Sequence, residues 1–424
     1  MDILITNVWL NSRKAHIAIQ GNRISTITFG EEPLCPTAQV IDGSNKAAIP
    51  GFVNGHTHAA MTLLRGYADD MPLDVWLKTK IWPREARLTP SMIYQGHRLA
   101  CLEMIKSGTT SFVDMYFHRS EGVRAAEEMG VRSVQPFLLM DFFDPARAKA
   151  LQQEAEEAYA RSAEESPSGL TQFALAAHSV YAVSAETLGW IARFSEKHNL
   201  SVHIHLSETE SEVADAMKNF GKSPVRYLAD MGFLSPRVVA DHALWLSDED
   251  ISILAEYDVK VVHNPASNLK LASGYRFLYN ELRTKGVCVG LGTDGCSSSN
   301  NLDMMEAMKL AALMQKAWRS DSSALPVAEV FEMATLNGGR IMNQPLGIVA
   351  EGALADLLLI DLEQPAFTPN FNLISNLVYS GNSSCVDTVI CNGRILMQNR
   401  LVPGEQAILH QARETAHNLV SDEN

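Results

Sequence analysis

The sequence lacks the features that mark membrane proteins and nucleic-acid-binding proteins. No stretch approaches the roughly 18 consecutive apolar residues that a membrane-spanning helix requires. Lys and Arg number 35 against 49 Asp and Glu, a net charge of −14, and no basic cluster interrupts this acidic balance. Nucleic acids and anionic membranes are therefore not expected partners. No basic segment precedes the first apolar residues, so we also expect no secretory signal.

Cysteine is scarce as well, and no Cys-x-x-Cys pair occurs, which argues against a disulfide framework and against a thiolate zinc site. The six cysteines are scattered: Cys35, Cys101, Cys288, Cys296, Cys385 and Cys391. This usage is typical of a cytoplasmic protein with reduced thiols. Any bound metal must then be held by imidazole and carboxylate groups, and the 13 histidines make such a site feasible.

Both ends of the chain have the pattern of β-strands. Residues 2–10 and 15–19 contain alternating apolar positions, and Gly21-Asn22 after them is a hairpin signal. The other end repeats this character in three short apolar segments, Ala355–Asp361, Val386–Cys391 and Arg394–Met397. Neither end can bury a sheet alone. We therefore predict one small β-sandwich domain that combines residues 1–54 with residues 349–424.

Between the two ends, strand-like apolar runs alternate with amphipathic helical segments. The eight runs are Ala47–Gly55, Thr110–Tyr116, Ser133–Met140, Gln172–His178, Ser201–Leu206, Val238–Ala243, Val259–His263 and Cys288–Asp294. The helical segments include Pro90–Ser107, Arg147–Ser162, Ala185–His198, Ser211–Met231 and Asp303–Trp318. This α/β alternation favours a (β/α)8 TIM-like barrel over residues 55–348. An open, doubly wound parallel sheet is the alternative.

Ionisable side chains gather where these runs end. The residues concerned are His56, His58, His178, His205, Glu208, His242, His263 and Asp294. Because the carboxyl ends of barrel strands meet at one mouth, these side chains are expected to converge there. His56 and His58 are two positions apart on an extended segment, so both imidazoles point to the same side. With a third imidazole and a carboxylate from other strands, they form a mixed nitrogen and oxygen site for a metal.

Several motifs carry a resemblance to a known family. They are Pro50-Gly51-Phe52-Val53-Asn54-Gly55-His56-Thr57-His58, His205-Leu206-Ser207-Glu208-Thr209, His242 and Gly292-Thr293-Asp294-Gly295. In this order and spacing the sequence resembles the amidohydrolase superfamily. The wider context, including Ser267-Asn268-Leu269-Lys270-Leu271-Ala272-Ser273-Gly274, is similar to the 5′-methylthioadenosine/S-adenosylhomocysteine deaminases.

The resemblance implies roles for particular residues. Carried over by position, His56, His58, His205 and Asp294 are ligands of one divalent metal. Zinc is the expected metal, and Fe²⁺, Mn²⁺ and Ni²⁺ accept the same ligands. Glu208 becomes the proton shuttle, His242 the second catalytic imidazole, and Asp294 the acceptor of a proton from the attacking water. Homo-oligomers are common in the family, so a homo-oligomer is expected.

The absence of a lysine near the end of the fourth run bears on the number of metals. Members of the superfamily with two metals bridge them through a modified lysine at the end of strand four. This sequence has no lysine between Lys149 and Lys197, and the fourth run ends in His178. We therefore predict one metal rather than two.

Residues for substrate binding also follow from the resemblance. Glu85 lies 27 residues after His58, the family spacing of a glutamate that binds both ribose hydroxyls. Trp76 is expected to pack against the purine or its 5′ substituent, His178 to bond a ring nitrogen, and Glu208 to reach the base. His203, by contrast, is expected to be a hydrogen-bonded interior residue.

The expected function is hydrolytic deamination of a 5′-modified adenosine, with 5′-methylthioadenosine, 5′-deoxyadenosine or S-adenosylhomocysteine as substrate. Arg147 and Arg161 lie in the region where the family binds the homocysteine carboxylate, but neither matches the family spacing. The smaller apolar 5′ groups are therefore favoured. The alternatives are a deaminase or chlorohydrolase of another purine, pterin, pyrimidine or triazine, and a metal-binding barrel without catalytic activity.

Overall fold

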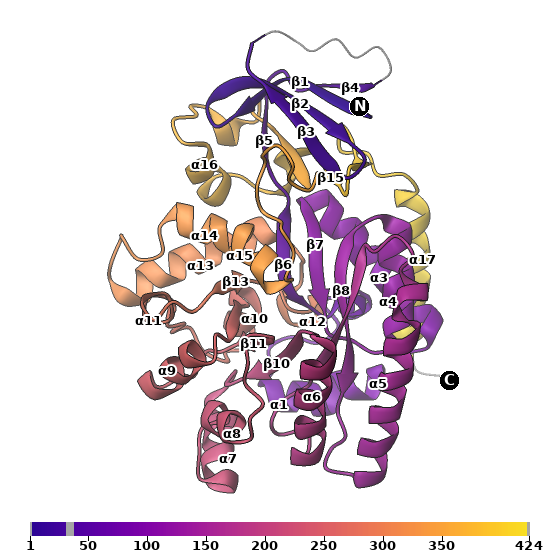
Figure 1. The fold of residues 1–424 in the computed structure, drawn as a ribbon, viewed down its shortest axis with the longest axis vertical. Helices are drawn as coiled ribbons and strands as arrows, with labels where there is room; N and C mark the ends of the chain where they lie inside the picture. The colour runs from indigo at the N-terminus through magenta and orange to yellow at the C-terminus, as the bar shows by residue number, and fades with distance from the viewer. Residues whose placement is uncertain (1, 31–37, 422–424) are drawn as a thin grey trace.

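The central part of the chain forms a parallel β-barrel in the computed structural model, which describes residues 2–30 and 38–421 (Figure 1). Eight strands pair in chain order: β6 (Phe52–Thr57), β7 (Thr109–Asp114), β8 (Arg132–Leu139), β9 (Thr171–Ala177), β10 (Val202–Leu206), β11 (Val238–His242), β12 (Lys260–His263) and β13 (Val289–Leu291). The last and first strands meet where the amides of Thr293 and Asp294 donate to the carbonyl of His56, at 3.2 and 3.0 Å. The predicted (β/α)8 barrel is confirmed.

Helices surround this barrel. The longer ones are α3 (Pro90–Ser107), α4 (Arg119–Met129), α5 (Pro145–Glu165), α6 (Ala185–His198), α7 (Glu210–Phe220), α8 (Pro224–Asp230), α9 (Asp248–Glu256), α13 (Met304–Arg319) and α14 (Val327–Met333). Shorter ones are α10 (Pro265–Lys270), α11 (Tyr279–Thr284), α12 (Cys296–Ser299) and α15 (Leu336–Ile341). The single helix predicted over Ser211–Met231 is wrong, because Gly221 adopts a left-handed conformation (φ 67°) that ends α7 before α8 begins.

A separate mixed sheet is built from both chain ends, which confirms that the two ends combine, and its strands pair as one sheet where a β-sandwich was predicted. Its strands are β1 (Ile3–Leu10), β2 (Arg13–Gln20), β3 (Arg23–Thr28), β4 (Gln39–Asp42), β5 (Lys46–Pro50), β14 (Leu357–Asp361), β15 (Val386–Cys391) and β16 (Arg394–Met397). They pair in the order β16-β15-β14-β5-β1-β2-β3, and β4 pairs with β1. Ile5, Ile17 and Leu357 belong to the buried apolar cluster of this sheet. Figure 1 shows this sheet stacked on one end of the barrel, where β5 leads into β6.

The chain passes from one sheet to the other at Gly51. The sequence suggested one run over Ala47–Gly55, but its first half is β5, which pairs with β14, and its second half opens the barrel as part of β6. At Gly51 a Cβ atom would lie 2.2 Å from Thr110 Oγ1. Only glycine therefore fits this close crossing, and the single predicted strand is corrected to two.

The C-terminal part of the chain adds helices to the barrel as well as strands to the small sheet. Helix α16 (Leu373–Tyr379) contacts α13 and α14, and α17 (Glu405–Val420) runs along α3. Ala412 and Leu419 of α17 are buried in one apolar cluster with Trp76 and Ile81, which belong to the short helical segments α1 (Leu73–Trp76) and Leu77–Ile81. The C-terminal helix therefore supports the segment that carries Trp76.

A buried ion pair links the two sheets. Arg132 on β8 binds Asp356, which precedes β14, through Nε to Oδ2 at 2.9 Å and through Nη2 to Oδ1 at 3.3 Å. The two residues are 5% and 4% exposed. A two-point contact between a guanidinium and a carboxylate fixes both position and orientation, so it holds the small sheet in register with the barrel.

Within residues 2–30 and 38–421, none of the helices combines the length and the hydropathy that crossing a lipid bilayer demands. The five cysteines in these residues are unpaired thiols, and four of them are buried, in agreement with the expectation from the sequence. Cys35 lies outside the described residues.

Candidate metal-dependent active site

Two histidines and an aspartate meet at the mouth of the barrel. His56 lies at the end of β6, His58 follows it, and Asp294 follows β13. Asp294 Oδ1 is 3.5 Å from His56 Nε2 and 3.1 Å from His58 Nε2. Closure of the barrel between β13 and β6 brings these three residues together, although 236 positions separate His58 from Asp294.

His205, at the end of β10, completes this group. Its Nε2 atom is 3.3 Å from His58 Nε2. The other ring nitrogens of both residues face backbone carbonyls: His58 Nδ1 donates to Met115 O at 2.6 Å, and His205 Nδ1 donates to His178 O at 2.8 Å. Because a carbonyl only accepts, these contacts assign the protons to Nδ1 and leave both Nε2 lone pairs facing the same space.

Asp294 uses its two oxygens differently. Oδ1 faces the histidines, whereas Oδ2 accepts hydrogen bonds from Ser267 Oγ at 2.6 Å and Ser298 Oγ at 3.1 Å. Burial disfavours the charged form, but contacts with His56 and His58 hold the pKa of Asp294 well below its usual range. The residue is therefore an ionised carboxylate whose Oδ1 is directed toward the imidazoles.

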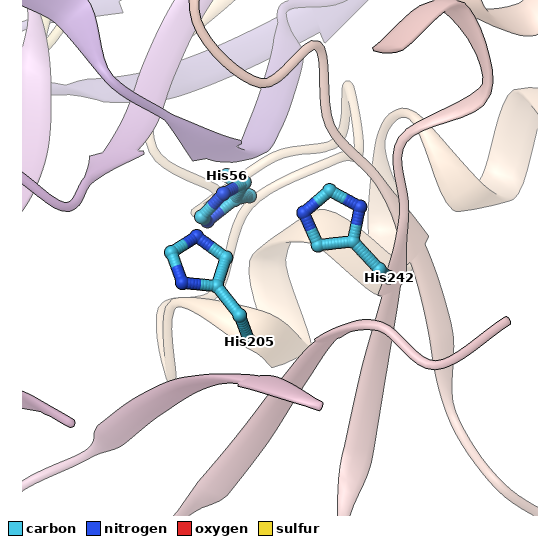
Figure 2. Close-up of side chains that lie close together, drawn as sticks. All are labelled: His56, His205 and His242. Carbon is cyan, nitrogen blue, oxygen red and sulfur yellow. The ribbon is translucent and has the colours of Figure 1, made fainter. Parts of the chain in front are cut away.

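These side chains fit a divalent metal. His56 Nε2 is buried and has no hydrogen-bond partner among the described residues, as expected of a nitrogen whose lone pair serves a metal. Burial opposes a charge on His56, but Asp241 and Asp294 raise its pKa to about 10, so the surroundings favour a cation. His56, His58 and Asp294 offer three ligand atoms within 4.8 Å of one another, as do His56, His205 and His242 (Figure 2). Imidazoles with a carboxylate suit zinc and its neighbours among the divalent metals.

His242 stands beside this group at the end of β11. Asp241 is the register partner of His205 on the neighbouring strand, so both side chains point into the barrel. Because side chains alternate along a strand, an extended backbone would turn His242 to the outside of the barrel. His242 instead has a left-handed backbone with φ 71°, which allows its ring to lie over the mouth, as Figure 2 shows. Its Nδ1 donates to Asn268 Oδ1 at 2.8 Å. Its Nε2 is thereby free to face the cavity.

Glu208 lies on the loop after β10, three residues beyond His205. Burial raises the pKa of this carboxyl, while the nearby His242 opposes the shift. The amides of Ser207 and Glu208 donate to the two carboxylate oxygens of Glu212, at 3.0 and 2.8 Å. These bonds fix the loop that presents Glu208 to the cavity.

The predicted substrate-binding residues line the same cavity. Its walls include His58, Trp76, Glu85, Tyr116, His178, Tyr181, His205, Glu208, His242 and Asp294. Glu85 accepts a hydrogen bond from Tyr116 Oη at 2.7 Å, and burial raises its pKa. Burial lowers the pKa of His178 to about 4, so its imidazole is neutral at pH 7. Trp76 Nε1 donates to Ala68 O at 3.0 Å, which leaves its ring to serve as an apolar wall.

A second, wider cavity continues outward from this one. It shares Trp82, Glu85 and Tyr116 with the inner cavity and is also lined by Phe142, Arg147 and Arg161. The guanidinium of Arg147 lies over the ring of Phe142, 5.1 Å from its centroid. The arginines that did not match the family spacing therefore do face the approach to the site.

Sequence reasoning missed the residues that support this site from behind. Asp114 Oδ1 accepts bonds from the Ala59 amide at 2.7 Å and Thr57 Oγ1 at 3.2 Å, and so holds both sides of His58. Its other oxygen binds His97 Nε2 at 2.8 Å. The position of Asp114 at the end of the second run was a usable signal. His97 gave none, because helix α3 brings it to the barrel only in three dimensions.

The chain is similar to known proteins over most of its length. A 5′-deoxyadenosine deaminase from Methanospirillum hungatei is 47% identical over 382 residues, which cover 90% of this chain and 85% of that protein. A 5-methylthioadenosine/S-adenosylhomocysteine deaminase from Archaeoglobus fulgidus is 44% identical over 428 residues, 98% of this chain and 99% of that protein. The crystal structure of an adenosine deaminase from Xanthomonas campestris with bound zinc is similar at a TM-score of 0.89 and 30% identity, over 99% of this chain and 98% of that one.

The model of the amidohydrolase family matches residues 47–396, which span the whole barrel together with most of the C-terminal strands. This match covers more than half of the chain, and the relatives are similar over most of their own length. The chain is an enzyme that belongs to the amidohydrolase family.

Proposed function

We propose that the protein hydrolytically deaminates 5′-modified adenosines, releasing ammonia and the corresponding inosine. The observation that carries this proposal is that Glu85, suited to a ribose diol, lines the same cavity as Glu208, His242 and Asp294. The names of the relatives from Methanospirillum hungatei and Archaeoglobus fulgidus support the same class of substrate.

The proposed metal is one zinc ion, held by His56, His58, His205 and Asp294. A zinc ion in such a site acts as a Lewis acid and lowers the pKa of water toward 7. The zinc in the adenosine deaminase from Xanthomonas campestris and the unpartnered Nε2 atom of His56 support this assignment. The absence of a lysine between Lys149 and Lys197 supports a single ion.

The proton transfers fall to three side chains. Water adds to C6 of the adenine ring, and Asp294 accepts the proton that the water loses. Glu208, whose pKa burial raises, donates its proton to ring N1 as the ring loses aromaticity. It then takes the proton of the new C6 hydroxyl and passes it to the amino group, which leaves as ammonia, while the proton held by Asp294 returns to Glu208. His242, whose Nδ1 is bound to Asn268, directs Nε2 toward the attacking oxygen and orients it.

The remaining residues hold the nucleoside. Glu85 accepts hydrogen bonds from both ribose hydroxyls, and the Tyr116 hydroxyl keeps its carboxylate in place. His178 is neutral and can therefore donate or accept at a ring nitrogen of the base. The buried ring of Trp76 packs against the purine or its 5′ substituent.

We favour a small apolar 5′ group, as in 5′-deoxyadenosine or 5′-methylthioadenosine. Arg147 is largely exposed, and its guanidinium stacks on the ring of Phe142. To form an ion pair with the homocysteine carboxylate of S-adenosylhomocysteine, it would have to leave this ring. Comparable kcat/KM values for S-adenosylhomocysteine and 5′-methylthioadenosine would contradict this preference. Loss of only the S-adenosylhomocysteine activity in R147A would then identify the arginine responsible.

Ammonia release from a panel of substrates tests the proposal. The panel contains 5′-deoxyadenosine, 5′-methylthioadenosine, S-adenosylhomocysteine, adenosine, adenine, guanine, cytosine, a pterin and a chlorinated triazine. We expect the zinc-loaded protein to prefer the 5′-modified adenosines. Activity confined to a free base, to the pterin or to the triazine would contradict the proposed substrate class. It would favour the alternative, a deaminase or chlorohydrolase of another purine, pterin, pyrimidine or triazine. No activity on any member would contradict the proposed substrate class and both groups of alternatives in the panel.

A further inference from the structure

Asp241 is a buried carboxylate behind the metal site that has no role in the proposed reaction. It lies on β11 directly before His242 and is 0% exposed. Its Oδ2 atom is 3.2 Å from His56 Nδ1 and 3.7 Å from His203 Nδ1. Register pairing with His205 on β10 turns Asp241 into the barrel, below the ligand group.

The two imidazoles are the partners of this carboxylate. Neither oxygen of Asp241 receives a standard hydrogen bond from any described residue, and both ring nitrogens of His203 are likewise without one. This corrects the expectation that His203 is a hydrogen-bonded interior residue. A buried carboxylate is retained in a fold only where positive or proton-donating groups compensate for its lost hydration. For Asp241 these groups are His56 and His203.

The contact favours one tautomer of His56, although Nδ1 and Asp241 Oδ2, 3.2 Å apart, do not have the geometry of a standard hydrogen bond. A carboxylate accepts hydrogen bonds, so Asp241 favours a proton on Nδ1 and leaves the lone pair on Nε2. This Nε2 is the buried atom that faces Asp294 Oδ1 at 3.5 Å. His58 and His205 have their protons fixed by neutral carbonyl oxygens, whereas His56 faces a charged acceptor.

We propose that Asp241 is a positioning residue that fixes the tautomer and the ring of His56 and, through its negative charge, tightens the binding of the metal. This inference rests on the proposed metal site but not on the proposed substrate. If the inference is correct, loss of the Asp241 charge weakens metal binding. If Asp241 has only a structural role, its loss changes the stability of the fold but not the metal affinity. His203 Nδ1 lies 3.7 Å from the same Oδ2 atom, so both imidazoles face one oxygen of the carboxylate.

Zinc affinity of the D241N and D241A variants tests the inference. Asparagine keeps the size of the side chain but removes its charge, and alanine removes the acceptor as well. Zinc transfer to a chromogenic chelator should show affinity reduced by about 10- to 100-fold in D241N, and by more in D241A. The melting temperature of each metal-free variant reports whether the fold itself is affected.

The matched control is D356N, which removes another buried carboxylate far from the histidines. It should lower the melting temperature, because Arg132 loses its partner, and leave zinc affinity unchanged. Wild-type zinc affinity in D241N overturns the inference, even if D241A fails to fold. Wild-type protein that binds no zinc would instead refute the metal site, and zinc-loaded protein that deaminates no adenosine would refute the proposed function alone.

Discussion

His242 and Glu208 face each other across the cavity, with His242 Nε2 3.9 Å from Glu208 Oε2. The same Nε2 atom is 3.9 Å from Asp294 Oδ2. Both distances exceed a direct hydrogen bond. The three groups therefore surround a space in which each can contact the atoms of a reacting molecule rather than one another.

The E208Q variant should lose most of its turnover. Glutamine has the shape of glutamate but can neither donate a proton to ring N1 nor pass one to the leaving ammonia, so kcat should fall by about 10²- to 10⁴-fold. KM should change little. Steady-state kinetics with 5′-deoxyadenosine measure both. S273A is a matched control, because Ser273 Oγ lies 3.4 Å from Glu208 Oε1 without taking part in proton transfer, and it should retain most of the activity.

The E85Q variant should separate nucleosides from free bases. The amide of glutamine can accept only through its oxygen, so kcat/KM for 5′-deoxyadenosine should fall by about tenfold or more. The small activity on adenine should not change, because adenine has no diol. Y116F removes the hydroxyl that donates to Glu85 and should produce the same pattern with a smaller amplitude. Equal losses on nucleoside and base would show that Glu85 does not bind the ribose.

The pH dependence of stability should include a contribution from His263, which is buried and stacks on Phe277 with ring centroids 4.0 Å apart. Burial, with a smaller effect of His242, lowers its pKa to about 3. The unfolded chain therefore binds one more proton than the folded one between about pH 3 and 6.5. Stability is lost as pH falls through this window, by about 1.4 kcal/mol per pH unit from this residue.

The H263Q variant should remove that contribution, since glutamine does not titrate. Urea unfolding of both proteins between pH 7.5 and 5 measures the difference in free energy of unfolding. The gap between wild type and variant should shift in favour of the variant as pH falls. A constant gap across this range would show that His263 does not have the lowered pKa.

Breaking the ion pair between Arg132 and Asp356 should destabilise the fold strongly. R132M leaves the buried carboxylate of Asp356 without its guanidinium, at a cost of about 3 to 5 kcal/mol. The double variant R132M/D356L should recover part of this loss, since no unpaired charge remains. R226A, which removes an exposed pair with Glu249, should leave the urea midpoint almost unchanged. A small effect of R132M would mean that the pair does not link the two sheets.

The sequence predicted the barrel because apolar runs and helical segments alternate, and it predicted the group at the mouth because parallel strand ends converge. His56, His58, His205, Glu208, His242 and Asp294 do lie together. Their order along the chain was enough to identify the family, which the comparisons confirmed. Their roles as ligands and proton carriers remain predictions.

The rest depended on contacts between residues far apart in the chain. The chain passes from one sheet to the other at Gly51, which packs closely against Thr110. The hydrophobic pattern of residues 47–55 does not show that Thr110 will lie there. Asp241 stands with His242 at the end of the sixth run, but the sequence assigns it no partner, and only the folded barrel brings it beside His56. Helix α17 joins the barrel through α3, a contact that the pattern of its own residues does not specify.

The decisive measurement is the conversion of 5′-deoxyadenosine by the zinc-loaded protein, compared with adenine in the same assay. We predict equal amounts of ammonia and 5′-deoxyinosine, with kcat/KM for adenine lower by about tenfold or more because Glu85 then has no diol to bind. Deamination of adenine at an equal or higher rate, or no reaction of 5′-deoxyadenosine, would contradict it.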